Sequence, residues 1–529
     1  MAVRFLDAAN HALEDVFTLQ GVTARQPRLS SDKFDWSWRG PNDDIEWAWF
    51  LNRLTWLPDL WRAYQKTGDI QYLSCLLRTV EDWMTSNPAP RMLSFSPAWR
   101  PLEAARRLLY VWLPMLPAWQ ADEDFPDELY LKLKQSLIEH GCYLRRHHAL
   151  GGNHLITEML ALLSLAYTIP EEAESYDWKA YALGRMDRCY REQVYPDGVY
   201  KELSVHYHRI VAQNYMRLMK LLTEAKDQEA LELWKPRIEK LWSYMHWVAK
   251  PNGYGPLNND SDLEKLGRYI RKQGPPRVRR QPLESCFYPW AGQAVFRGKE
   301  TAHWSFFDLG ARGTDHQHDD FMHVNLAIGH ADFLVDCGRF TYEPGAWREY
   351  FVGTRAHNCV MLNDRPCDQG PKQYTRQPEI DARIGDAECT VSGKASFYTS
   401  TGQRSGDWQR RFSYTVDQSW LVEDEMIVFG ANCMTTYWHW HPDCVLSGDL
   451  LSAEGLIVRC GNEKLRVTLE AVGQVVSTHL SSVSGLTEPQ PQGWYSEKFN
   501  QRVPAPVLVV EQRLYGAVRN IWKFTDLNL

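Results

Sequence analysis

The sequence lacks the features that mark several specialised classes of protein. It has no run of eighteen apolar residues, so no membrane-spanning helix is predicted. Its first ten residues contain no basic segment leading into an apolar one, and so do not read as a secretory signal. We therefore expect a cytoplasmic protein, or a periplasmic or secreted one whose signal has been removed.

Cysteine pairs with metal-binding spacing are also absent. The eleven cysteines include no Cys-x-x-Cys, which favours reduced, buried thiols over a disulfide framework or a structural zinc cluster. The helix-borne His-Glu-x-x-His of zinc proteases is missing as well. No strict internal repeat is visible in the sequence.

What is present describes a globular chain of ordinary composition. The 529 residues are 44% apolar and 24% charged, enough for two or three domains. A net charge of −7 gives no reason to expect nucleic acid as a partner. Two basic islands, residues 145–148 and 268–280, are each interpreted as solvated surface or linker. The 23 tryptophans suit either carbohydrate clefts or helical cores.

Apolar periodicity predicts a helical first half, residues 1–280. Apolar residues three and four apart continue from Trp47 to Tyr64, which predicts one helix that stops at Gly68. Further helices are expected up to about residue 249, separated by short polar turns. Such helices form an antiparallel array, which is a bundle, a solenoid or a closed ring of hairpins.

The second half, residues 281–529, has a different pattern. Residues 274–280 contain two prolines and several charges, which predicts a linker. Beyond them, segments such as Gln293–Arg297 and Val324–Ile328 alternate with period two. Many short strands separated by Gly, Asp and Asn turns indicate an antiparallel β-sandwich. We therefore predict a helical domain over 1–280 and a β-sandwich domain over 281–529.

The stretch Asp315 to His323 concentrates three histidines and three carboxylates that can carry chemistry. Together with Asp336 and His357, its central His318 could bind one divalent metal ion from three separate strands. The alternative is a hydrogen-bonded His-Asp-His cluster without metal. If residues 316 and 318 share one strand face, His316 is available for catalysis while His318 supports the structure.

Two motifs of the helical half could also contribute. Gly151-Gly152-Asn153-His154 begins an apolar helix, where an asparagine N-cap is the ordinary interpretation. The glycines would also let a ligand approach the backbone. Tyr207 has histidines on both sides and Arg209 nearby. Cations can lower the pKa of a phenol enough for it to act as a general base, although a solvated tyrosine is the simpler interpretation.

Five of these motifs occur in an order that resembles the heparinase II/III-like polysaccharide lyases. They are Gly-Asn-His, Ser-x-x-Tyr-His, His-x-His-x-Asp, Val-Asp-x-Gly and Ala-His-Asn, and the segment from Trp99 to Arg106 is similar too. The resemblance implies an incomplete (α/α) toroid followed by a β-sandwich, with a cleft between them. It also implies β-elimination of a uronic-acid-containing glycan, which leaves an unsaturated uronate.

The resemblance assigns roles to individual residues. Asn153 and His154 would stabilise the substrate carboxylate, Tyr207 would act as base, acid or both, and His316 would be its partner. Substrate-binding roles fall to Arg106, Glu202, His208, Arg348, Arg355 and Asn358, with structural ion pairs as the alternative for the last three. His318, Asp336 and His357 would hold a structural Zn²⁺, with Asp320 and His323 orienting the ligands.

One departure from the family pattern affects the predicted substrate. Some relatives have an acidic residue three positions after the histidine of Asn-His, where this chain has Thr157. Glu158 follows one position later, which rotates its carboxylate by about 100° around the helix, out of the cleft. We expect an anionic glycosaminoglycan-like substrate such as heparan sulfate, hyaluronan or chondroitin, with alginate- or glucuronan-type oligosaccharides as the alternative. A zinc hydrolase and a non-catalytic glycan-binding protein are the rival functions, and a homodimer is left open.

Overall fold

A computed structural model describes residues 2–19, 21–311, 313, 316–368 and 370–528. The chain forms two compact units. Unit 1 comprises residues 1–192 and 217–228, and unit 2 comprises residues 193–216 and 229–529. Asp315 of the predicted catalytic stretch lies outside the described residues. The domain boundary predicted at residue 280 marks the change from helices to strands, whereas the two units are defined by their compactness. That boundary stays a prediction.

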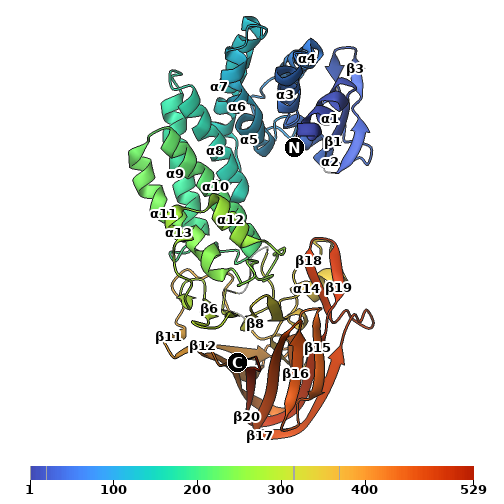
Figure 1. The fold of residues 1–529 in the computed structure, drawn as a ribbon, viewed down its shortest axis with the longest axis vertical. Coiled ribbons are helices and arrows are strands. Elements are labelled where there is room, and N and C mark those ends of the chain that lie inside the picture. Colours follow the sequence, from blue (N-terminus) through green and yellow to red (C-terminus); the bar gives the residue numbers. More distant parts are fainter. Residues whose placement is uncertain (1, 20, 312, 314–315, 369, 529) are drawn as a thin grey trace. The chain divides into compact units, whose positions relative to one another are not determined.

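Unit 1 is mainly helical (Figure 1). Its elements are α1 (Ala2–Leu13), β1 (Val16–Leu19), β2 (Val22–Arg25), β3 (Arg28–Ser30), β4 (Lys33–Phe34), α2 (Ile45–Asn52), α3 (Leu57–Thr67), α4 (Ile70–Ser86), α5 (Pro101–Arg107), a π-helical turn (Leu108–Trp112), α6 (Leu113–Gln120), α7 (Asp127–Arg146), α8 (Gly152–Thr168) and α9 (Ser175–Gln193).

Two features of unit 1 differ from the sequence prediction. The single helix expected from Trp47 to Tyr64 is two helices, because Leu54 has a left-handed backbone (φ 57°) that no helix continues through. Residues 16–34 form two small hairpins within the region predicted to be helical. The helix stop at Gly68 is confirmed, since this glycine caps α3 in the left-handed conformation (φ 71°).

The helices that follow contribute to both units or to unit 2. Residues 217–224 of α10 (Val205–Glu224) belong to unit 1, and its earlier residues belong to unit 2. After α11 (Gln228–Val248), the predicted linker contains structure of its own. It begins directly after α12 (Leu266–Gln273) and holds the short helix α13 (Pro276–Arg279).

Two antiparallel sheets make up most of unit 2. The five-stranded sheet has the order β5-β6-β7-β8-β9. Its strands are β5 (Cys286–Tyr288), β6 (Gln293–Arg297), β7 (His303–Asp308), β8 (His323–Ile328) and β9 (Ala331–Leu334).

The nine-stranded sheet has the order β11-β12-β13-β14-β20-β17-β16-β15, with β10 also paired to β14. Its strands are β10 (Val360–Leu362), β11 (Asp381–Ile384), β12 (Glu388–Tyr398), β13 (Arg404–Thr415), β14 (Ser419–His439), β15 (Cys444–Asp449), β16 (Gly455–Cys460), β17 (Glu463–Val483) and β20 (Val507–Asp526). The helix α14 (Ala346–Val352) and the hairpin β18 (Trp494–Lys498) and β19 (Gln501–Pro504) complete the unit.

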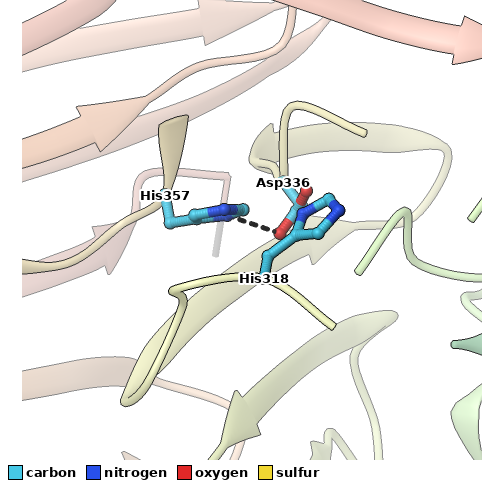
Figure 2. A group of neighbouring side chains, drawn as sticks. All are labelled: His318, Asp336 and His357. Atoms are coloured by element: carbon cyan, nitrogen blue, oxygen red, sulfur yellow. Dashed lines mark hydrogen bonds and ion pairs between the residues drawn. The ribbon is translucent and has the colours of Figure 1, made fainter. Parts of the chain in front are cut away.

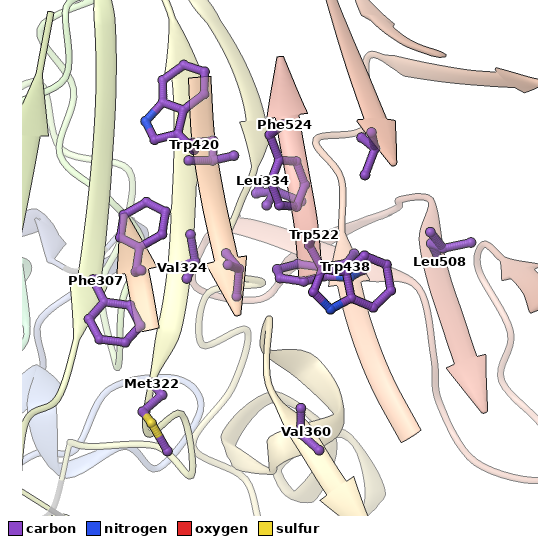
Figure 3. Packing of buried hydrophobic residues seen from close by; sticks show 14 of the residues in the cluster. Phe307, Met322, Val324, Leu334, Val360, Trp420, Trp438, Leu508, Trp522 and Phe524 are labelled. Carbon is purple, nitrogen blue, oxygen red and sulfur yellow. The ribbon is translucent and has the colours of Figure 1, made fainter. Parts of the chain in front are cut away.

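A single apolar core joins the two sheets (Figure 3). Phe307 and Val324 of the smaller sheet pack in one cluster with Trp420, Trp438 and Trp522 of the larger sheet. At least twelve tryptophans of the chain are almost completely buried, so core packing is a main use of this residue. A helical first half followed by an antiparallel, sheet-rich second half confirms the predicted fold class. Among the described residues, none of the helices combines the length and apolarity needed to cross a membrane.

A buried ion pair connects the large sheet to the loops before β8 and β10. Arg410 of β13 faces Asp424 of β14 in register, with Nε 2.7 Å from Oδ1, and both side chains are fully buried. The same guanidinium donates to the carbonyls of Met322, at 2.9 Å, and Asn358, at 2.6 Å. These residues directly precede His323 and follow His357, so the pair holds the predicted site residues against the sandwich.

We expect Asp424→Ala to lower the free energy of unfolding by about 3–5 kcal/mol, because it leaves the Arg410 charge buried without its partner. Urea denaturation followed by tryptophan fluorescence measures the change. Asp386→Ala is the matched control: it removes an exposed pair with Lys299 and should leave the midpoint unchanged. Equal midpoints for the two variants would contradict the structural role of the buried pair.

Candidate functional site

The buried carboxylate of Asp260 is the centre of the candidate site in unit 2. Its Oδ2 accepts a hydrogen bond from His316 Nδ1 (3.1 Å), and its Oδ1 accepts one from His318 Nε2 (2.9 Å). Arg348 donates to both oxygens, at 2.6 and 2.9 Å. Burial alone would raise the pKa of Asp260, but these hydrogen bonds hold it well below the ordinary value. The group is therefore a permanent anion that orients two imidazoles.

Tyr207 stacks directly on His316. The ring centroids are 3.9 Å apart and the planes are inclined by 18°. The Tyr207 hydroxyl lies 2.9 Å from the hydroxyl of Tyr342, which accepts a hydrogen bond of 2.5 Å from Arg339. Asp262 holds that guanidinium with two hydrogen bonds of 2.9 Å. The structure thus brings together the phenol and imidazole that the sequence predicted to act as partners.

The protonation of Tyr207 differs from the sequence expectation. Burial raises the pKa of its phenol, and the hydrogen bond from Tyr342 and the charge of Arg339 only partly oppose this effect. The expected lowering by neighbouring cations is therefore not seen. A neutral phenol near pH 7 is a proton donor rather than a ready base.

Sequence reasoning missed four residues of this cluster: Asp260, Asp262, Arg339 and Tyr342. The first two lie in the run Asn-Asn-Asp-Ser-Asp at residues 258–262, which is strongly polar yet partly buried. The Asn259 side chain accepts a hydrogen bond from the backbone N–H of His318, at 2.7 Å. Five consecutive polar residues are an available signal, but they are equally typical of an exposed turn.

His318, Asp336 and His357 converge as the sequence predicted, with one ligand atom from each within 4.8 Å of the others (Figure 2). They lie in loops rather than on strands: before β8, after β9 and before β10 respectively. The backbone N–H of Gly338 donates to Asp336 Oδ1 at 2.9 Å. Its left-handed conformation (φ 78°), and the carbonyl of Ser496 lying only 2.2 Å from where a Cβ would be, explain why glycine stands in this motif.

This donor set fits a divalent metal ion. His318 Nδ1 and His357 Nε2 are buried and have no hydrogen-bond partner in the part of the chain that the structure describes. Burial lowers the pKa of His318, and a neutral imidazole is the form that ligates metal. His318 donates through its other nitrogen to Asp260, in the carboxylate–histidine arrangement that orients a metal ligand.

Asp320 and His323, which were predicted to orient the metal ligands, are both buried. His323 Nε2 lies 3.8 Å from Asp336 Oδ2, and its Nδ1 accepts the backbone N–H of Asn358 at 2.9 Å. Burial lowers the pKa of His323 to about 3 and raises that of Asp320 well above its ordinary value. His323 is therefore neutral at pH 7, and burial favours the neutral form of Asp320, whereas the lowered pKa values of Asp336 and Asp260 keep these two groups anionic beside the imidazoles.

Several predicted substrate-binding residues have structural roles instead. His208 is buried, with one ring nitrogen accepting from the Tyr200 N–H and the other bonded to the Leu241 carbonyl. Asn358 is completely buried, and its amide donates to the carbonyls of Val324 and Val335. Neither side chain has a free polar atom for a ligand, so both assignments are corrected.

The other residues of unit 2 that were predicted to bind substrate are Arg348, Glu202 and Arg355. Arg348 forms an ion pair with Asp260 and thereby positions that carboxylate. Glu202 accepts from the Tyr200 hydroxyl at 2.8 Å and lies 3.9 Å from His316 Nε2. Arg355 pairs with the exposed Asp364 at 3.2 Å.

A second group of predicted residues belongs to unit 1. A cavity of about 370 Å³ is lined by His154 and Glu158 of α8, together with Trp49 and Arg100. The Arg100 guanidinium lies 3.9 Å from the centroid of the Trp49 ring. Glu158, which was expected to point out of the substrate cleft, lines this cavity together with His154.

The other predicted residues of unit 1 are Asn153 and Arg106. Asn153 is half-buried in the first turn of α8, whose N-cap is Gly151, so the expected asparagine N-cap is not found. Burial lowers the pKa of Arg106, which lies near Arg53 and Glu103. The predicted contacts of both side chains with substrate stay predictions.

The chain matches two family models along most of its length. Heparinase II/III N-terminus covers residues 6–273, and Heparinase II/III-like, C-terminal covers residues 280–522. A heparin-sulfate lyase of Bacteroides stercoris is 22% identical over 551 residues, spanning 93% of this chain and 77% of that protein. A heparin-sulfate lyase of Pedobacter heparinus is 28% identical over 454 residues, spanning 79% and 66%.

Solved structures show the same fold. The crystal structure of the heparan sulfate lyase HepC from Pedobacter heparinus has a TM-score of 0.80 at 20% identity, covering 99% of this chain and 83% of that one. A crystal structure of heparinase III has a TM-score of 0.77 at 17% identity, covering 99% and 85%. At these identities the likeness is one of fold.

We expect a divalent metal ion to copurify with the protein and to be lost in His357→Ala, because this change removes a buried ligand. Elemental analysis of the purified protein measures the metal content. His479→Ala removes an exposed imidazole of β17 and should leave that content unchanged. Absence of metal from the parent, after growth with added metal and purification without chelators, would identify the cluster as hydrogen-bonded only.

Protonation of Glu158 should make stability depend on pH. Burial raises its pKa to about 7, so the folded state binds a proton that the unfolded chain releases near the ordinary carboxyl value of 4.5. This difference contributes roughly 3 kcal/mol to the free energy of unfolding. The contribution is fully present below pH 4.5 and is lost as the pH rises through 7.

Thermal unfolding at pH 5 and pH 8 tests this expectation. The drop in melting temperature between the two should be smaller in Glu158→Gln than in the parent, because glutamine does not titrate. Glu123→Gln, which changes an exposed carboxylate of the same unit, should behave like the parent. An identical pH dependence in all three proteins would contradict the raised pKa.

Proposed function

The chain belongs to the heparinase II/III family, and from that premise we propose that it is a polysaccharide lyase acting on a uronate-containing, heparin-type glycan. The cleavage is a β-elimination that removes the C5 proton of a uronate, breaks the bond to the leaving glycosidic oxygen and leaves a double bond. The names of the relatives, heparin-sulfate lyases, support the substrate class.

The observation that carries the proposal is the stack of Tyr207 on His316 beside the Asp260 anion. A β-elimination needs one group to take a proton and another to give one within reach of a single sugar linkage. An imidazole and a phenol in van der Waals contact meet that requirement.

The geometry favours His316 as the base and Tyr207 as the acid. Asp260 accepts from His316 Nδ1, so the other ring nitrogen, Nε2, is the one that can take the C5 proton. The phenol of Tyr207, whose pKa is raised by burial, is protonated at neutral pH and can donate to the leaving oxygen. Arg339 and Tyr342 stabilise the phenolate that this donation produces.

Neutralisation of the substrate carboxylate is assigned to unit 1. The C5 proton becomes removable when donors stabilise the enolate-like charge that develops on that carboxylate. Asn153 can donate from its amide and His154 can add a donor, as the family resemblance implies. We propose that these two side chains bind the uronate carboxylate of the substrate.

We further propose that the metal ion of His318, Asp336 and His357 is Zn²⁺ with a structural role. Two imidazoles and a carboxylate are a donor set that zinc accepts readily. The ion would brace the loops that carry His318 and His357. The chemistry itself is left to His316 and Tyr207, which lie outside this ligand set.

Incubation with heparan sulfate, heparin, hyaluronan, chondroitin, alginate and glucuronan tests the function. We expect new ultraviolet absorbance from the unsaturated uronate with at least one sulfated, heparin-type polymer. In Tyr207→Phe, kcat should fall by about 10²–10⁴, because the proton donor is lost. Tyr176→Phe, an exposed tyrosine, is the matched control and should keep full activity.

Three results would contradict the proposal. New reducing ends without the absorbance would indicate a hydrolase, and binding without either product would indicate a glycan-binding protein. Full activity of Tyr207→Phe would remove the acid assignment while leaving the lyase reaction in place.

A further inference from the structure

Seven cations form an exposed surface on α12 and α13 and the residues that flank them. The members of this cationic surface are Lys265, Arg268, Arg271, Lys272, Arg277, Arg279 and Arg280, and all of them are exposed. The sequence contains no aspartate or glutamate from residue 266 to residue 283. This local excess stands out in a chain whose net charge is −7.

Within the described part of the chain, little of this charge is paired with carboxylates. Among the described residues, Arg277 is the only member with a carboxylate within 4.0 Å, namely Glu239 at 3.6 Å. A cluster of like charges destabilises the folded chain by self-repulsion, and an anionic partner would relieve that repulsion.

The cations are held outward by the burial of the opposite face. Leu266, Ile270 and Val278 are buried and anchor the two helices to unit 2. A helix that inserts into a lipid surface must expose apolar residues, and in this case the apolar residues are already covered. The arrangement therefore favours a soluble polyanion over a membrane.

The cationic surface adjoins the catalytic cluster within unit 2. Arg209, two residues after Tyr207 on α10, lies with its guanidinium 4.9 Å from the Tyr269 ring of α12. Gln213, one turn further along α10, donates to Gln273 at the other end of α12, at 2.9 Å. In the sequence, only residues 261–265 separate Asp260 from the start of α12. The eight residues of α12 extend this surface by about 12 Å.

We propose that the cationic surface is an exosite that binds the anionic glycan outside the sugars being cleaved, so that long chains are held more tightly than short ones. This inference rests on the proposed function for the identity of the polymer. Exposed arginine and lysine side chains pair with sulfate and carboxylate groups of the chain that extends beyond Tyr207 and His316. Such pairing weakens as salt screens the charges.

A binding experiment tests the surface without turnover. In a Tyr207→Phe background, Arg268→Gln, Arg271→Gln and Lys272→Gln are combined, since glutamine preserves helix propensity. We expect this triple variant to elute from immobilised heparin at lower salt than the background protein. The control combines Arg459→Gln, Lys464→Gln and Arg466→Gln, three exposed cations of β16 and β17, and should elute with the background protein.

A kinetic experiment in the active enzyme separates the exosite from the cleavage site. We expect the ratio of KM for heparan sulfate to KM for its tetrasaccharide to rise about tenfold in the α12 triple variant and not in the control variant. A melting temperature equal to that of the parent shows that the variant is folded.

Equal elution of the two triple variants would overturn the proposal. So would a KM that rises equally for polymer and tetrasaccharide, because the surface would then belong to the cleavage site. Loss of binding to duplex DNA with unchanged binding to heparin would point to a nucleic acid partner and also overturn it. If the parent forms no unsaturated product, the proposed function fails, while the heparin elution still decides whether the surface binds a sulfated glycan.

Discussion

The candidate site depends on one buried charge, the carboxylate of Asp260. A buried carboxylate is costly unless cations and hydrogen-bond donors surround it, and here Arg348, His316 and His318 supply them. The same anion orients His316, the proposed base, through one oxygen and His318, a candidate metal ligand, through the other. A single residue from the segment between α11 and α12 therefore links the proposed base to the candidate metal site.

The sandwich provides the rigid frame for this charge network. The Arg410–Asp424 pair carries the hydrogen bonds from the large sheet to the carbonyls beside His323 and His357. Asn358 adds a second connection, because its amide donates to the carbonyls of Val324, in β8, and of Val335, directly after β9. Asn358, which the family resemblance assigned to substrate binding, thus helps to hold the loops in which the candidate metal ligands lie.

Charge is distributed unevenly over unit 2. Inside the site, each cation has a carboxylate partner, as in the pairs Arg348–Asp260 and Arg339–Asp262. On α12 and α13 the cations are exposed and largely without such partners. The first arrangement fixes side chains in place, whereas the second remains available to an anionic chain from solution.

The order of a helical half and a strand-rich half can be predicted from the residues alone, because periodicities of 3.6 and 2 follow from which faces are buried. The sequence also identified His316, Tyr207 and the set His318, Asp336 and His357, since these residue types recur in family motifs. The contacts in the folded chain add Asp260, Asp262, Arg339 and Tyr342 to these residues. They also give His208 and Asn358 structural roles and place Glu158 in the same cavity as His154. Each of these outcomes depends on contacts between distant segments and on burial, which no local pattern of residues encodes.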